Sequence, residues 1–262
     1  MTSTLGLPET IQACLFDLDG VVTRTAVVHA AAWKETFDAF LYARGGKDFR
    51  PFDEAHDYDE YVDGRPRADG VRTFLASRGI ELPEGEPGDP PDARTVNGLG
   101  NRKNELLLEK IRTQGVQAYD GTLRYIAAAR ARGLRTAIVS SSANTRDVLR
   151  SIEAEQLFEV RIDGVVAAER ELPGKPRPDT FLAAARDLGV EPARAAVFED
   201  ALAGMDAGRA GNFGYVVGVD RVGQSDAMYA HGADIVVKDL AELADLTEPA
   251  DLPGGVDGGG RE

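Results

Sequence analysis

The stretch CLFDLDGVVTRTAVVHAAAW (Cys14–Trp33) begins as a short apolar segment and continues as an amphipathic helical pattern. Residues 13–16 (ACLF) are typical of a buried strand, and Asp17 and Asp19 follow it with one leucine between them. Because neighbouring like charges destabilise each other, such a pair needs a positive partner. In open parallel sheets, ligands bind beyond the carboxyl ends of the strands. We therefore expect a functional site that includes this pair.

Short apolar runs alternate with helical patterns along most of the chain. Strands are predicted at 13–16, 136–139, 195–198, 215–219 and 234–237. Helices are predicted at 121–133, 144–158, 178–189 and 201–211. This alternation predicts an α/β fold with a doubly wound, Rossmann-like parallel sheet covered by helices on both faces.

The stretch between about Ala30 and Gly115 interrupts the alternation. Its pattern is mostly helical, as at 32–45 and 101–115, and a loop rich in proline, glycine and acidic residues lies between. We predict a helical cap domain at 30–114, inserted into a core domain formed by 1–29 and 115–246, with the sheet resuming near Tyr119. The glycine-rich tail 247–262 is predicted to be disordered.

Composition and charge limit the classes of function. The 262 residues carry 30 lysines and arginines against 44 aspartates and glutamates, a formal net charge of −14, which disfavours nonspecific binding of nucleic acid or an anionic membrane. Cys14 is the only cysteine, which excludes an internal disulfide and favours a reducing compartment. The first residues lack a secretion signal, and no apolar run approaches the ~20 residues that cross a bilayer. We expect a cytoplasmic protein, and the sequence leaves its oligomeric state open.

Polar clusters follow three of the predicted strands, and a fourth precedes a helix. Each alone is typical of a surface turn or a helix cap. Their common placement predicts that they converge on one edge of the sheet. The clusters are Asp17 with Asp19, Ser140 to Ser142, Glu199 with Asp200, and Lys175 in the loop GKPRPD.

Taken together, these segments resemble the four motifs of the haloacid dehalogenase-like phosphotransferases. The matching segments are FDLDGVVT (16–23), VSSSAN (139–144), GKPRPD (174–179) and VFEDALAG (197–204). Three further segments resemble, more narrowly, the β-phosphoglucomutase branch. These are TAVVHAAAWK (25–34), DGRPRADGVRTFL (63–75) and GNRKNELL (100–107).

The resemblance implies a nucleophile and an acid–base group at the aspartate pair. Asp17 would attack phosphorus in line and form an aspartyl phosphate. Asp19 would protonate the leaving oxygen and deprotonate the acceptor hydroxyl. A strand that continued regularly would place both side chains on one face.

A hard divalent cation with oxygen ligands would remove the repulsion among these carboxylates, and Mg²⁺ suits such a site. The resemblance implies Mg²⁺ ligands at Asp17, at the backbone carbonyl of Asp19 and at Asp200, with Glu199 as a close or outer partner. It also implies phosphate- or substrate-binding roles for several residues, namely Ser140, Ser141, Asn144, Lys175 and Gly64.

Residues of the predicted cap would recognise the substrate. Thr25 and His29 lie four apart on one helix and therefore share a face. A lone histidine in a helix is more often a structural residue that hydrogen-bonds a backbone oxygen. The sequence distance between His29 and the aspartate pair matches the mutase pattern, however, and favours a role near Asp19. Arg67 matches the cap arginine that binds the non-transferring phosphate, and Lys103 matches a second basic group. The alternative for both residues is a solvent-exposed charge at a helix end, and this alternative is stronger for Lys103 than for Arg67.

The leading hypothesis is a phosphomutase that interconverts β-D-glucose 1-phosphate and glucose 6-phosphate, with Mg²⁺ as cofactor and glucose 1,6-bisphosphate as activating phosphoryl donor. The alternative is a Mg²⁺-dependent sugar-phosphate phosphatase, and a non-catalytic sugar-phosphate sensor is the third hypothesis. Arg24, Ala143 and Ala201 depart from residues that are common in the family. These departures leave open whether the substrate is a glucose or a disaccharide phosphate.

Overall fold

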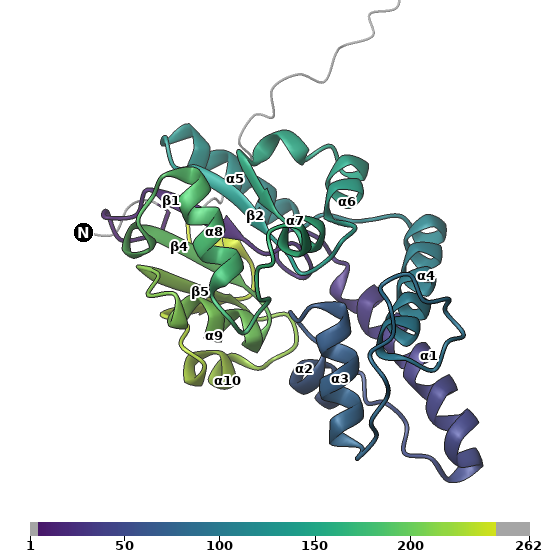
Figure 1. Ribbon diagram of the computed structural model, residues 1–262. Coiled ribbons are helices and arrows are strands. Elements are labelled where there is room, and N and C mark those ends of the chain that lie inside the picture. Colours follow the sequence, from purple (N-terminus) through teal and green to yellow (C-terminus); the bar gives the residue numbers. More distant parts are fainter. Residues whose placement is uncertain (1–4, 245–262) are drawn as a thin grey trace, which may run out of the picture.

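The computed structural model describes residues 5–244 and contains a six-stranded parallel sheet (Figure 1). The strands are β1 (Ala13–Phe16), β2 (Arg135–Val139), β3 (Val160–Ile162), β4 (Ala195–Glu199), β5 (Tyr215–Val219) and β6 (Ile235–Val237). Their order in the sheet is β3-β2-β1-β4-β5-β6, so the winding reverses at β1. This order confirms the doubly wound fold. It also places the end of β1 at the topological switch point, where ligands bind.

Helices cover both faces of this sheet. The core helices are α5 (Asp120–Ala131), α6 (Thr145–Ser151), α7 (Gly164–Glu169), α8 (Asp179–Leu188), α9 (Leu202–Ala210) and α10 (Ser225–Ala230). Strand residues alternate between the faces. Phe16 packs in one apolar cluster with residues of α5 and α6, and its neighbour Leu15 packs in a second cluster with residues of α8 and α9. A sheet buried on both faces explains why its strands are apolar runs.

The predicted strands are present, but two details of the prediction were wrong. The predicted helix 144–158 ends at Ser151, because the chain turns at Glu153, where φ is +54°, and continues as a 3-10 turn at Glu155–Leu157. The next residues form β3, which at three residues is too short to show a period. Near Tyr119 the chain returns to the core as helix α5, and the next strand begins only at Arg135.

Four helices follow β1 and form a separate body beside the sheet (Figure 1). They are α1 (Ala26–Gly45), α2 (His56–Tyr61), α3 (Arg67–Ser77) and α4 (Val96–Gln114). An apolar cluster of their own holds Trp33, Phe37 and Leu41 as core residues. The rings of Trp33 and Phe37 stack at 4.9 Å. The division of the chain into a cap at 30–114 and a two-part core stays a prediction.

Two neighbouring segments connect this helical body to the sheet. Thr23 and Ala118 form an antiparallel bridge, the N–H of Arg24 donates to Gln117 O at 2.8 Å, and the N–H of Tyr119 donates to Val22 O at 2.9 Å. The guanidinium carbons of Arg24 and Arg221 lie 4.6 Å and 3.5 Å from the centre of the Tyr119 ring. The two connections are therefore held side by side.

Short 3-10 segments complete the described structure at Gly46–Asp48, Pro192–Arg194 and Leu240–Glu242. Within residues 5–244, none of the helices has both the length and the apolar character that a membrane span requires. The predicted disorder of 247–262 concerns residues outside the described range.

Candidate active site

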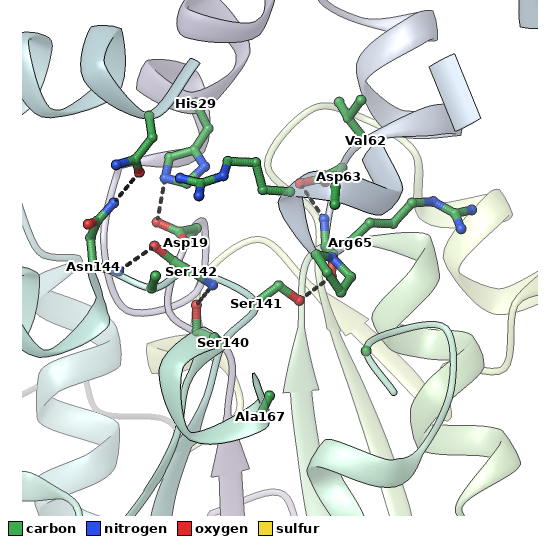
Figure 2. A pocket seen from close by; sticks show the side chains of 18 of the residues that line it. Asp19, His29, Val62, Asp63, Arg65, Ser140, Ser141, Ser142, Asn144 and Ala167 are labelled. Atoms are coloured by element: carbon green, nitrogen blue, oxygen red, sulfur yellow. Dashed lines mark hydrogen bonds and ion pairs between the residues drawn. The ribbon is translucent and has the colours of Figure 1, made fainter. Parts of the chain in front are cut away.

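A cavity of about 360 Å³ lies between the carboxyl ends of the central strands and the helices α1–α4 (Figure 2). Ten of the thirteen predicted site residues line it, and the other three lie directly behind the lining. The lining residues are Asp17, Asp19, His29, Gly64, Arg67, Lys103, Ser140, Ser141, Asn144 and Asp200. Lys175 and Glu199 form an ion pair with each other next to Asp17, and Thr25 hydrogen-bonds Asp19. The structure thus brings all thirteen together.

Asp17 occupies the first position beyond β1, where its N–H donates to Phe198 O at 2.9 Å and continues the ladder to β4. Lys175 Nζ donates to Asp17 Oδ1 at 2.5 Å and to Val139 O at 3.2 Å. Burial raises the pKa of Asp17 well above its usual range, and although Lys175 lowers it, Glu199 and Asp19 raise it further. One lysine therefore does not balance the acidic groups that surround it.

The carboxylates of Asp17, Glu199 and Asp200, here named the acidic cluster, fit a divalent cation. One oxygen of each lies within 4.8 Å of the others, and all three residues are buried. Burial raises the pKa of Asp200 well above its usual range, and the neighbouring carboxylates raise it further. A buried set of oxygen donors with excess negative charge suits Mg²⁺, which prefers such ligands.

Gly20 shows how tightly the acidic cluster is enclosed. Its φ is +87°, and a Cβ at this position would lie 1.6 Å from Asp200 Oδ2. A side chain at residue 20 is therefore excluded both by backbone conformation and by the carboxylate.

Asp19 reaches the cavity by a different route from the one predicted. Strand β1 ends at Phe16, and Asp19 lies in a turn in which the N–H groups of Val22 and Thr23 donate to Leu18 O at 2.9 Å. Strand alternation was thus the wrong reason for the shared direction of the two aspartates. The turn brings Thr25 close enough for its hydroxyl to donate to Asp19 Oδ1.

A partly buried chain of polar groups links Asp19 to the helical body. His29 Nε2 lies 3.6 Å from Asp19 Oδ1, and His29 Nδ1 lies 3.0 Å from Lys103 Nζ. Burial, followed by the charge of Lys103, lowers the pKa of His29 to about 4 despite the opposing effect of Asp19. Burial also lowers the pKa of Lys103 to about 7. At neutral pH the imidazole is therefore uncharged, whereas the lysine is close to its titration point.

The two predicted basic groups of the helical body both reach the cavity. Lys103 has 4% of its surface exposed and lies 4.9 Å from the centre of the Trp33 ring, so the alternative of a solvated helix-end charge is wrong for this residue. Arg67 begins α3, and its Nη2 donates to Asn101 Oδ1 at 3.0 Å. Both basic groups line the cavity and come from the helical body, whereas the acidic cluster belongs to the core.

The helical body contacts the core through small and polar groups at the rim. Ser141 Oγ donates to Gly64 O at 2.7 Å, and Asn144 Nδ2 donates to Asn104 Oδ1 at 3.0 Å (Figure 2). A Cβ on Gly174 would lie 2.1 Å from the ring of Pro66. The described arrangement is thus closed, with the loop between α2 and α3 resting on the core.

Sequence reasoning missed Asp63, which precedes the predicted site residue Gly64 in that loop. Asp63 Oδ1 accepts a hydrogen bond from Gly64 N at 3.0 Å, and the hydroxyl of the buried Tyr58 also hydrogen-bonds Asp63. Burial raises the pKa of Asp63 to about 7, although the hydrogen bond from Tyr58 lowers it. The segment DGRPRADGVRTFL includes this aspartate, but only Gly64 and Arg67 were predicted to belong to the site. The Asp-Gly pair, typical of a turn, is the feature that could have drawn attention to it.

Comparisons with known proteins show the family of this chain. A family model described as haloacid dehalogenase-like hydrolase matches residues 11–212. A protein named β-phosphoglucomutase from Mycobacterium tuberculosis is 57% identical over 245 residues, 91% of this chain and 94% of that protein.

Solved structures show the same fold. A β-phosphoglucomutase from Clostridium difficile matches with a TM-score of 0.70 and 24% identity, over 89% of this chain and 93% of that one. A mutant of CbbY from Rhodobacter sphaeroides, in complex with xylulose-1,5-bisphosphate, matches with a TM-score of 0.67 and 26% identity, over 88% and 96%. From the family model and the 57% identity together, the chain belongs to the haloacid dehalogenase-like superfamily, in its β-phosphoglucomutase-like branch, and it is an enzyme.

Proposed function

We propose that this enzyme is a Mg²⁺-dependent phosphomutase that interconverts β-D-glucose 1-phosphate and glucose 6-phosphate. The observation that carries the proposal is the position of Asp17. Its carboxylate faces the cavity, lies 2.5 Å from Lys175 Nζ and belongs to the acidic cluster, while Arg67 and Lys103 face it from the helical side. A substrate with a phosphate at each end matches a site with a nucleophile on one side and basic groups on the other.

In the proposed reaction, an oxygen of Asp17 attacks phosphorus and the bond between phosphorus and the ester oxygen breaks. Asp19 gives its proton to that oxygen, and Thr25 and His29 hold Asp19 in position. In the second half, Asp19 takes the proton of the acceptor hydroxyl, which attacks the phosphorus of phospho-Asp17. The product of one such transfer is glucose 1,6-bisphosphate, which returns its other phosphate to Asp17.

The residues around Asp17 would stabilise the transferring group. Lys175 and Ser140 would hold its oxygens, and Asn144 would contact a substrate phosphate at the start of α6. A magnesium ion, held by Asp17, Asp200 and the Asp19 carbonyl with Glu199 close by, would neutralise the negative charge that gathers there.

On the helical side, Arg67 and Lys103 would bind the phosphate that is not transferred, because a guanidinium can contact phosphate through two N–H groups. Gly64 and Ser141 already hydrogen-bond each other across the rim and would border the substrate. Closure over the substrate would exclude water, which would otherwise hydrolyse phospho-Asp17.

A second candidate function is a phosphatase that uses the same residues with water as the final acceptor. The family model that matches residues 11–212 carries the description hydrolase, which favours keeping this alternative. Ala143 is a second reason to keep the phosphatase alternative, because some mutases carry a positively charged lysine at this position. The same assay also tests whether the substrate is a glucose phosphate or a disaccharide phosphate.

One assay separates the two functions. The enzyme is incubated with Mg²⁺, β-glucose 1-phosphate and a trace of glucose 1,6-bisphosphate, and both glucose 6-phosphate and free phosphate are measured. The mutase proposal expects glucose 6-phosphate in large excess and a strong requirement for the bisphosphate. Rapid release of phosphate with little glucose 6-phosphate would overturn it. A parallel reaction with maltose 1-phosphate tests the disaccharide alternative.

A further inference from the structure

A carboxylate of the helical body, Asp63, stands over the acidic cluster. It lies in the loop between α2 and α3 and lines the cavity together with Asp17 and Asp200. Figure 2 shows it above the ends of the strands, on the far side of the cavity from Asn144. None of the proposed steps of phosphoryl transfer uses this residue.

The loop that carries Asp63 is seated closely on the core. A Cβ on the next residue, Gly64, would lie 2.9 Å from the Cβ of Ala201, which directly follows Asp200. The hydrogen bond from Ser141 to Gly64 O fixes the same loop from the other side. The N–H of Gly64 in the loop and the hydroxyl of Tyr58 in α2 hold the carboxylate of Asp63. The position of this carboxylate relative to the acidic cluster therefore depends on closure of the helical body over the core.

Electrostatic effects agree with this geometry. Among the neighbouring charges, Asp63 raises the pKa of Asp200 most strongly, ahead of Asp17 and Glu199. Besides burial, the charge of Asp59, and after it the charge of Glu199, raises the pKa of Asp63. Closure thus brings another negative group to the acidic cluster, in which Lys175 already pairs with both Asp17 and Glu199.

We propose that Asp63 is a positioning residue that makes closure of the helical body over the core depend on a divalent cation in the acidic cluster. The proposal rests on the proposed function, which assigns Mg²⁺ to that cluster. Without the cation, closure brings a carboxylate toward like charges, so the open state is favoured. When a bound divalent cation adds two positive charges to the acidic cluster, the carboxylate of Asp63 is attracted to the cluster. Because such coupling is reciprocal, closure also strengthens cation binding.

The test measures closure directly by the distance between two spin labels. Lys47→Cys lies beyond the far end of α1 and Glu169→Cys lies in α7 of the core; both positions are exposed. The native Cys14 is buried in β1 and is protected from labelling. Distance distributions are recorded with and without Mg²⁺ in the doubly labelled protein and in the same protein with Asp63→Asn. The control is Glu60→Gln, which removes one exposed charge from the preceding helix α2 but does not line the cavity.

With the native Asp63, Mg²⁺ is expected to increase the closed fraction several-fold, and Glu60→Gln is expected to leave this increase unchanged. Asp63→Asn is expected to be largely closed already without Mg²⁺, so that the increase falls at least about fivefold. Tyr58→Phe, which frees the Asp63 side chain from one hydrogen bond, is expected to reduce the increase by a smaller factor. An equal Mg²⁺-dependent increase in Asp63→Asn and the native protein would overturn the proposal.

Calorimetry of the native protein with Mg²⁺ separates this proposal from the proposed function. If Mg²⁺ binds but the label distance does not change, the coupling is wrong and the metal site stands. If the native protein does not bind Mg²⁺ at millimolar concentration, the proposed metal site fails, and the coupling fails with it. The measurement on the native protein remains decisive even if Asp63→Asn does not fold.

Discussion

The two sides of the cavity are built on different principles. On the core side, Asp17 and Glu199 are buried at the ends of adjacent strands, and the buried Lys175, which comes from a loop, pairs directly with both. On the helical side, Arg67 and Asp63 come from a helix end and a loop, are partly exposed and form few direct pairs. Strand ends hold reacting groups rigidly, whereas loops and helix ends can adapt to a ligand. We therefore expect the core side to determine the reaction and the helical side to determine affinity and closure.

The largest effect is expected for Asp17→Asn. The amide cannot act as the nucleophile, so phosphoryl transfer should fall by about 10⁴-fold or more, while the melting temperature stays close to that of the native protein. Steady-state kinetics and thermal unfolding check this prediction. Asp147→Asn, an exposed charge change in α6, serves as the control. Retention of even a tenth of the activity would contradict the core-side assignment.

Gly20→Ala tests how much the enclosed geometry of the acidic cluster matters. The added Cβ would meet Asp200 Oδ2 at 1.6 Å, so we expect a loss of activity of about 100-fold or more and destabilisation by about 3 kcal/mol. Gly223→Ala is a matched control, because φ is +90° there and a Cβ would meet nothing within 4 Å. It should cost only about 1 kcal/mol, measured by urea unfolding. Equal losses would show that backbone strain, not the carboxylate, accounts for the effect.

On the helical side, Arg67→Ala should weaken binding more than it slows the chemistry. Loss of a two-pronged contact to phosphate is expected to raise KM for the sugar phosphate by about 30-fold, with kcat changed only a few-fold. Hydrolysis of an aryl phosphate, which has no second phosphate, should be nearly unchanged. Arg102→Ala removes a neighbouring exposed charge and should alter neither value. Equal losses on both substrates would remove the assignment of Arg67 to the distant phosphate.

The smallest effect concerns the pH dependence of Lys103. Its pKa is lowered to about 7, so the amine is charged below pH 7 and becomes neutral as the pH rises. Affinity for the sugar phosphate is therefore expected to fall up to about tenfold between pH 6.5 and 8.5. Lys103→Arg should flatten this dependence, because a guanidinium stays charged throughout the range. Parallel pH profiles of KM for the two proteins would contradict the prediction.

The same contrast explains what could be predicted from the sequence. Apolar strands with polar residues at their ends have strong local patterns, so the fold and the positions of Asp17, Ser140 and Asp200 could be predicted. By contrast, β3 has only three residues, too few to show a periodic pattern of apolar residues. Asp63 lies in a loop that contacts three segments distant from it in the sequence. The burial that shifts the pKa of Lys103 arises only when α4 packs against α1. Such features depend on tertiary contacts and have no local pattern.

The two connections beside Tyr119 have a consequence for how proteins of this architecture diversify. Since Thr23 and Ala118 are bridged, the chain leaves the sheet and returns to it at adjacent points. A segment whose two ends meet can be exchanged for another without moving the strands that flank it, provided that the new segment buries its own apolar residues. The cluster around Phe37 satisfies that condition for this chain. Recombination between Val22 and Tyr119 could thus change substrate preference in one step while the phosphorylated aspartate proposed here stays in place.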